Sequence, residues 1–171
     1  MKLKLILSAL ILTTTIWVFG QDSTQLKRAP FKLTVAVDKK TVYEEDIKAT
    51  PFVLPNKVIQ LYPGETVFIE IEQENGAIRS ITAVDKIVDP AKTLTISFSQ
   101  IAKKKVHEST MLKIENPFPK DLIYKAKIFL LQQHRWVDTS VYAVGAKLLG
   151  FETWPDVIIA IALGNWEFKN D

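Results

Sequence analysis

Cysteine is absent from this chain of 171 residues, and histidine and glycine are scarce. Without cysteine the chain has no disulfide bond, no thiolate nucleophile and no attachment point for a lipid on sulfur, so its fold depends on packing alone. Histidine occurs only at His107 and His134. The six glycines stand singly, so there is no glycine-rich loop to cradle a phosphate group.

An apolar run long enough to span a bilayer is also lacking. A spanning helix needs about 18 or more apolar residues, whereas the run of residues 5–19 is interrupted by threonines and is soon followed by polar residues. Two lysines, Lys2 and Lys4, precede the run. We therefore predict a secretory signal peptide over residues 1–20, cleaved between Gly20 and Gln21, with a membrane anchor as the alternative. The mature protein is then periplasmic or extracellular and has no membrane span.

The mature chain also lacks a strong charge of either sign. Lys2 and Lys4 leave with the signal peptide, after which 20 basic residues face 19 acidic ones and the net charge is +1. A nearly neutral domain has no general attraction for nucleic acid, so we expect no nucleic-acid partner.

A period of two residues dominates the rest of the chain. Apolar side chains alternate with polar ones through at least five runs, which is typical of strands with one buried face. The runs are residues 31–37, 67–72, 94–98, 112–115 and 124–131. Short strands separated by turn residues predict an all-β fold, and we expect a single antiparallel Ig-like β-sandwich with Greek-key connections.

Turn chemistry separates these runs and predicts local pairing. Asn75-Gly76 between two alternating runs is a strong hairpin pattern, which would place Gln73 opposite Ile78 and Glu72 opposite Arg79. Residues 62–65, Tyr-Pro-Gly-Glu, predict a second turn. Two further segments, residues 85–91 and 99–108, have the composition to form short helical turns.

The predicted domain organisation is simple. Residues 21–30 are polar and are expected to be a flexible leader. Residues 31–171 are long enough to form one β-sandwich domain with its own core. A division into two smaller domains near Asp89 is the alternative.

Part of the chain resembles a known class of domain. Residues 112–117, Leu-Lys-Ile-Glu-Asn-Pro, and residues 122–128, Leu-Ile-Tyr-Lys-Ala-Lys-Ile, are similar to a strand pair of bacterial Ig-like sandwich modules. Residues 151–155 and 157–168 are similar to parts of uncharacterised exported bacterial proteins. The resemblance implies a fold class and brings no functional residues with it.

Residues with catalytic chemistry form no recognisable motif. A serine, histidine and aspartate set of Ser140, His134 and Asp138 can be drawn, but no Gly-x-Ser-x-Gly turn accompanies it. His107 lacks the second histidine that a helical zinc motif needs. We therefore expect no catalytic residues, no metal site and no cofactor.

Aromatic residues are the most promising ligand contacts. Trp136, Trp154 and Tyr142 lie in the C-terminal third, and Arg135 adjoins the first of them. An exposed tryptophan offers a large rigid surface to a sugar or peptide, so these four residues form the predicted ligand site, with burial in the core as the alternative.

Trp166 and Phe168 share one face of the last run and are expected to face the core. The three lysines 103–105 are expected to lie in a solvated loop, with contact to an anionic glycan or lipid as the alternative.

These features together predict an exported, non-catalytic binding or assembly module. Its partner is expected to be a protein that docks on an exposed edge strand. A carbohydrate- or ligand-binding sandwich that uses the C-terminal aromatics to hold a glycan is the first alternative. A hydrolase built on His134 and Asp138 is the more remote one.

Overall fold

The computed structural model describes residues 25–169. The predicted signal peptide, its cleavage site and the first residues of the predicted leader lie outside the described residues, so these expectations remain predictions. The described part contains twelve strands and one 3-10 turn. They are β1 (Phe31–Ala36), β2 (Val42–Ile47), β3 (Val53–Leu54), η1 (Pro55–Lys57), β4 (Val58–Leu61), β5 (Glu65–Glu74), β6 (Ala77–Val84), β7 (Thr93–Lys103), β8 (Val106–Glu115), β9 (Leu122–Leu130), β10 (Arg135–Thr139), β11 (Leu149–Trp154) and β12 (Ile158–Phe168).

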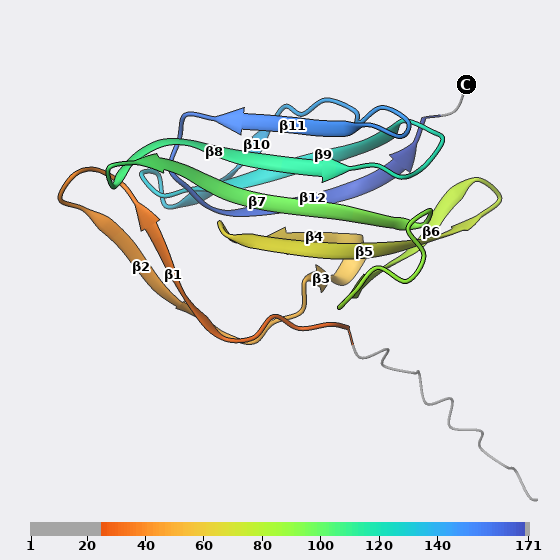
Figure 1. The fold of residues 1–171 in the computed structure, drawn as a ribbon, viewed down its shortest axis with the longest axis horizontal. Helices are drawn as coiled ribbons and strands as arrows, with labels where there is room; N and C mark the ends of the chain where they lie inside the picture. Colours follow the sequence, from red (N-terminus) through yellow and green to blue (C-terminus); the bar gives the residue numbers. More distant parts are fainter. Residues whose placement is uncertain (1–24, 170–171) are drawn as a thin grey trace, which may run out of the picture.

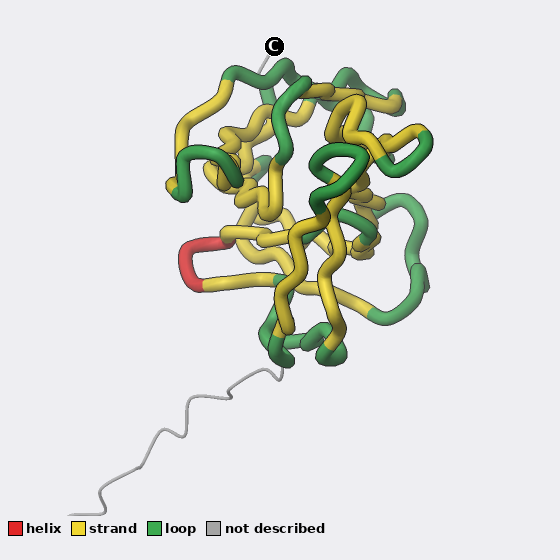
Figure 2. The backbone as a smooth tube through the Cα atoms, turned by 90° about the vertical axis from the view of Figure 1, so that its left-hand side faces the viewer, coloured by secondary structure: helices red, strands yellow, loops and turns green. Residues whose placement is uncertain are grey.

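Two antiparallel five-stranded sheets pack face to face, which confirms the predicted all-β sandwich (Figure 1). One sheet has the order β10-β9-β12-β4-β3 and the other the order β11-β8-β7-β5-β6. Figure 2 views the molecule end on and shows η1 as the single helical segment of the described chain. Alternating apolar residues of both sheets meet between the layers, and their burial is the main force that holds the sheets together.

The Asn75-Gly76 turn is confirmed, but part of the predicted register is wrong. Both turn residues have positive φ, at 51° and 80°, and Gln73 lies opposite Ile78 as expected. Glu72 lies opposite Ser80 instead of Arg79, because a β-bulge at Arg79 shifts the register between Glu72 and Gln73. The bulge lets Ile78 and Ile81 both face the core, which a strict period of two does not allow.

The two predicted helical segments are also wrong. Residues 99–108 form the end of β7, a tight turn and the start of β8. Lys104 and Lys105 occupy this turn with φ of 50° and 65°, the backbone geometry that favours a two-residue hairpin. Residues 85–91 form bends and a turn without helix. Residues 62–65 do form the predicted turn, in which Gly64 has a φ of 98°.

The β1–β2 hairpin forms a separate two-stranded sheet at one end of the sandwich (Figure 1, left). Leu33 and Val35 from β1 and Ile47 from β2 are buried against Val157 and Ile159. Ile158 faces the main core and its neighbour Ile159 packs under the hairpin, as alternation along a strand requires. A bulge between Ile158 and Ala160 then lets Ile158 and Ile161, three positions apart, both face the main core.

The end of the predicted flexible leader is held in place. Lys27 forms an isolated antiparallel bridge with Pro51, and the amide of Arg28 donates to the carbonyl of Thr50. The Arg28 side chain is buried. Residues 25–30 are therefore attached to the sandwich, because a buried guanidinium fixes the segment that carries it.

Candidate functional site

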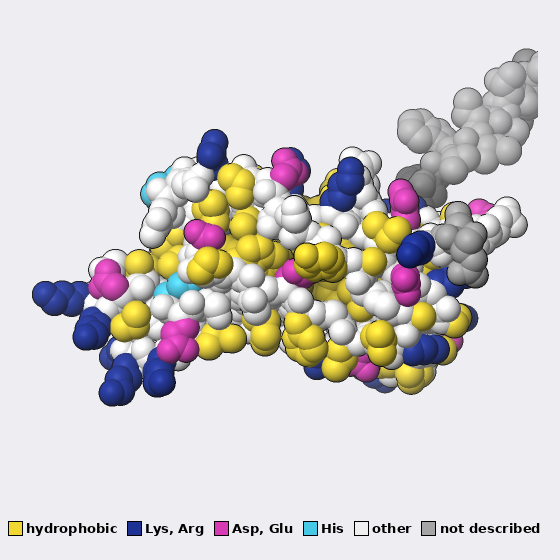
Figure 3. Space-filling view, turned by 90° about the horizontal axis from the view of Figure 1, so that it is seen from above, with side chains coloured by type: hydrophobic (Ala, Val, Ile, Leu, Met, Phe, Trp, Pro, Cys, Tyr) yellow, Lys and Arg dark blue, Asp and Glu magenta, His cyan; other side chains and the backbone are white. Residues whose placement is uncertain are grey.

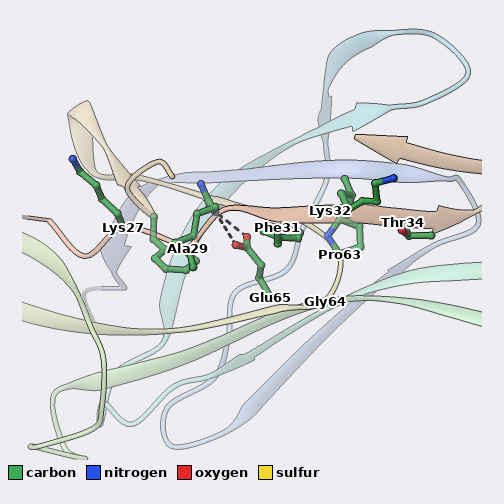
Figure 4. Close-up of a pocket in the computed structure, with 11 residues that line it drawn as sticks. Lys27, Ala29, Phe31, Lys32, Thr34, Pro63, Gly64 and Glu65 are labelled. Carbon is green, nitrogen blue, oxygen red and sulfur yellow. Dashed lines mark hydrogen bonds and ion pairs between the residues drawn. The ribbon is translucent and has the colours of Figure 1, made fainter. Parts of the chain in front are cut away.

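A groove of about 510 Å³ runs between the N-terminal segment and the turn that leads into β5 (Figure 4). We call it the β1 groove. Strand β1 contributes one wall, the β4–β5 turn contributes another, and Phe52 also lines the groove. Its lining residues are Lys27, Arg28, Ala29, Phe31, Lys32, Leu33, Thr34, Phe52, Pro63, Gly64 and Glu65.

Arg28 fixes the base of the β1 groove. Its Nε lies 2.7 Å from Oε1 of Glu65, and its Nη2 donates to the carbonyl of Gln60 at 2.6 Å. The guanidinium also lies over two rings, 4.7 Å from the centroid of Phe52 and 5.0 Å from that of Tyr62. The buried charge is therefore paired, hydrogen-bonded and in contact with aromatic faces, which are the conditions that a buried ion requires.

Strand β1 has one edge without a strand partner. Both backbone groups of Ala36 bind the side chain of Gln100: the amide donates to Oε1 at 2.9 Å and the carbonyl accepts from Nε2 at 2.7 Å. The backbone groups of Ala36 therefore point away from β2. Since strand geometry repeats every two residues, the N–H and C=O groups of Lys32 and Thr34 point the same way. No backbone partner for these two residues exists among residues 25–169.

His107 fixes the orientation of Gln100. The Gln100 amide nitrogen lies 2.8 Å from Nδ1 of His107, while Nε2 of that ring lies 3.1 Å from the carbonyl of Pro155. Because Pro155 offers an acceptor, this arrangement assigns the proton to Nε2 and leaves Nδ1 to accept from Gln100. His107 thereby connects the hairpin to the β11–β12 loop.

The four residues of the predicted ligand site do not come together. Trp154 is 9% exposed, belongs to the main core and donates its indole N–H to Thr139. Tyr142 is 85% exposed, and Arg135 binds its neighbour Gln133. Of the four, Trp136 alone lines the groove on the outer face of the β10-containing sheet, where it is 40% exposed.

The other predicted features lie as follows. Trp166 and Phe168 are buried, as expected from their shared face. Asp138 pairs with Lys127 at 3.4 Å, and no hydrogen bond links it to His134 or Ser140 in the described part of the chain. The same residues contain no cluster of three His, Asp or Glu that could hold a metal ion.

Lysines of two hairpin turns gather at one end of the molecule. The β1–β2 turn carries Lys39 and Lys40, while Lys103 ends β7 and Lys104 and Lys105 form the β7–β8 turn. All five are exposed, and both turns lie at the left end of Figure 1, where Figure 3 shows a group of basic side chains. The predicted solvated loop at residues 103–105 therefore forms part of a larger basic end.

Sequence reasoning did not identify Arg28, Gln100, Lys32 or Thr34 as site residues. Arg28 belongs to a polar segment that looks like a leader, and its partners Thr50, Gln60 and Glu65 are distant in sequence. Gln100 is one of many polar residues on alternating strands. Only the path of the hairpin across the end of the sandwich brings these groups together.

The architecture defines a class: an antiparallel β-sandwich that carries an additional N-terminal hairpin. The chain matches no protein-family model, no curated protein and no solved structure. Within residues 25–169, no helix has the length and apolar character needed to cross a membrane.

Proposed function

We propose that this protein is an exported, non-catalytic binding module that takes up an extended segment of a partner protein along the free edge of β1. The observation that carries the proposal is the pair of residues Lys32 and Thr34, which line the β1 groove and whose backbone groups point away from β2 without a strand partner in the described part of the chain. An extended chain laid beside them would add a strand to the hairpin through main-chain hydrogen bonds.

The Gln100–Ala36 contact supports this mode of binding. The carboxamide of Gln100 already forms with Ala36 the two hydrogen bonds that a peptide group of a neighbouring strand would form. At Ala36, the free edge of β1 therefore already binds an amide group through the hydrogen bonds of a strand pair. Two residues earlier, the equivalent groups of Thr34 border open groove.

The lining of the groove favours a particular partner chemistry. Phe31 and Phe52 offer apolar surface, and the charges of Arg28 and Glu65 neutralise each other at the base. Lys27 supplies positive charge at the rim, where the ammonium of Lys32 pairs with Glu44 of β2 at 3.1 Å. The partner segment is therefore extended, with alternating apolar and acidic side chains.

The test uses a fluorescently labelled peptide, acetyl-Val-Glu-Val-Thr-Val-Glu-Val-amide, and measures its affinity by anisotropy. Thr34→Pro removes the outward N–H without breaking the β1–β2 ladder, while Thr34→Val keeps that N–H and serves as the matched control. We expect Thr34→Pro to weaken binding by about tenfold and Thr34→Val to bind as the parent does.

A second arm separates main-chain pairing from charge. A peptide with the same side chains and N-methylated backbone amides should bind poorly, and exchanging its glutamates for lysines should abolish binding. Equal binding by Thr34→Pro and Thr34→Val, or by the methylated and parent peptides, would overturn the proposal. Circular dichroism of each variant verifies that the hairpin still folds.

A further inference from the structure

A second groove, of about 290 Å³, lies on the outer face of the β10-β9-β12-β4-β3 sheet beside β2. We call it the aromatic groove because four aromatic side chains line it. Its lining residues are Tyr43, Glu45, Gln60, Tyr62, Phe129, His134, Trp136, Ile159 and Ala160. Its volume lies just below the range of drug-sized sites, about 300–1,000 Å³, so it suits a small organic group better than an extended chain.

The aromatic side chains come from elements that are far apart in the sequence. Phe129 and Trp136 belong to the β9–β10 pair, and their rings meet edge to face, with centroids 5.6 Å apart and planes at 83°. Tyr43 comes from β2 of the hairpin, and Tyr62 follows β4. Two nearly perpendicular rings on one side and two phenols contributed by other elements provide aromatic surface in several directions.

The charge of the groove is negative. Neither lysine nor arginine lines it, and Glu45 is its one carboxylate. The hydroxyl of Tyr43 donates to Oε2 of Glu45 at 2.6 Å, which fixes the carboxylate at the groove. In the described part of the chain Glu45 takes part in no ion pair, whereas its neighbour Glu44 pairs with Lys32 at 3.1 Å.

We propose that the aromatic groove binds a small organic cation of the alkylammonium type. The faces of aromatic rings carry negative potential and attract cations, most strongly when the cation is only weakly hydrated, as an alkylated ammonium is. The unpaired carboxylate of Glu45 supplies the counter-charge. A neutral sugar would use the same ring surfaces but would gain nothing from the uncompensated negative charge.

Isothermal titration calorimetry with choline chloride tests the proposal. The reference ligand is 3,3-dimethyl-1-butanol, in which a carbon atom replaces the charged nitrogen at nearly the same shape. Ionic strength is held constant with sodium chloride. We expect choline to bind at least about tenfold more tightly than the neutral analogue, a difference of about 1.4 kcal/mol. Equal affinities would overturn the proposal, and so would binding of a neutral oligosaccharide with no binding of choline.

Two pairs of variants locate the site. Trp136→Ala and Glu45→Gln should each weaken choline binding, whereas their matched controls Tyr142→Ala and Glu44→Gln should not. Tyr142 is a highly exposed aromatic residue that does not line the groove. Loss of binding in both controls, or in neither groove variant, would place the cation elsewhere and overturn the proposal.

This inference is independent of the proposed peptide site. The variant Thr34→Pro alters the β1 groove alone, so choline affinity should be unchanged in it. Likewise, Trp136→Ala should leave the affinity for the acidic peptide unchanged. Each proposal can therefore fail without the other.

Discussion

The side chain of Gln100 pairs with the backbone of Ala36 through two hydrogen bonds of 2.9 and 2.7 Å. One residue of β7 thus holds the last residue of β1, although 64 positions separate them in the chain. The contact attaches the hairpin to the sandwich at its far end, while Arg28 attaches it near its start.

Removing the Gln100 side chain should loosen this end of the hairpin. Gln100→Ala leaves the amide of Ala36 without its acceptor, and we expect a loss of about 1–2 kcal/mol in the free energy of unfolding. Hydrogen exchange at the Ala36 amide should accelerate more than exchange in the core of β7. The control Gln132→Ala, at an exposed turn, should change neither quantity. Unchanged exchange at Ala36 would contradict the assigned contact.

Replacing Arg28 should be among the most damaging single changes. Arg28→Met leaves the carboxylate of Glu65 without the cation that it pairs with, and breaking such a buried pair costs about 3–5 kcal/mol. Urea unfolding followed by circular dichroism measures the effect. The double variant R28M/E65Q should recover part of the loss, because it removes the unpaired charge. No recovery would mean that the ion pair is not the source of the loss.

The three tryptophans of the described chain should respond differently to iodide. Trp136 is 40% exposed, whereas Trp154 and Trp166 are 9% and 6% exposed. We expect iodide to quench one fluorescence component, and Trp136→Phe should remove that component with little change in stability. Trp154→Phe should leave the quenching intact and lower stability, since Thr139 loses its indole donor. Quenching that survives in Trp136→Phe would contradict the exposures described.

Alkaline pH should destabilise the fold through two phenols, that of the half-buried Tyr43 and that of the buried Tyr124. Burial, assisted by the hydrogen bond to Glu45, raises the pKa of Tyr43 to about 12, and burial raises the pKa of Tyr124 as well. The fold therefore favours the neutral phenols. Their contribution to stability is complete below pH of about 10, the ordinary tyrosine pKa, and is lost as the pH rises toward about 12.

Urea unfolding at increasing pH measures this effect, with tyrosinate absorbance as a second readout. Tyr43→Phe should make the decline in stability shallower over the window above about pH 10. At about pH 7, where the phenol is neutral in both states, the pH dependence of the variant should match that of the parent. An unchanged slope in Tyr43→Phe would contradict the assigned cause.

The period of two predicted the sandwich because a strand with one buried face alternates apolar and polar side chains. The runs of residues 67–72, 94–98 and 124–131 became parts of β5, β7 and β9. The Asn75-Gly76 turn was also readable, since few residues adopt its backbone geometry. The sequence analysis did not predict the bulge at Arg79. The spacing of Ile78 and Ile81, three positions instead of two, is the feature that indicates it.

The candidate sites were much harder to predict. Trp154 and Trp136 are both predicted ligand contacts, yet Trp154 lies in the core and Trp136 on the outer face of its sheet. Which face a short strand buries depends on strands that are distant in sequence. Here β11 pairs with β8 in one sheet, and the next strand, β12, pairs with β9 in the other sheet. The composition of residues 99–108 predicts a helical turn, since nothing in it reveals the positive φ that Lys104 and Lys105 adopt in the hairpin turn.

Tyr62 stands between the two grooves. Its ring contacts the Arg28 guanidinium at the base of the β1 groove and also lines the aromatic groove. Any ligand that shifts this ring on one side alters the surface offered on the other. Thermodynamic linkage then requires reciprocity: whatever factor the cation imposes on peptide affinity, the peptide imposes on cation affinity. Should both proposed ligands bind, Tyr62 is the residue that links the two grooves.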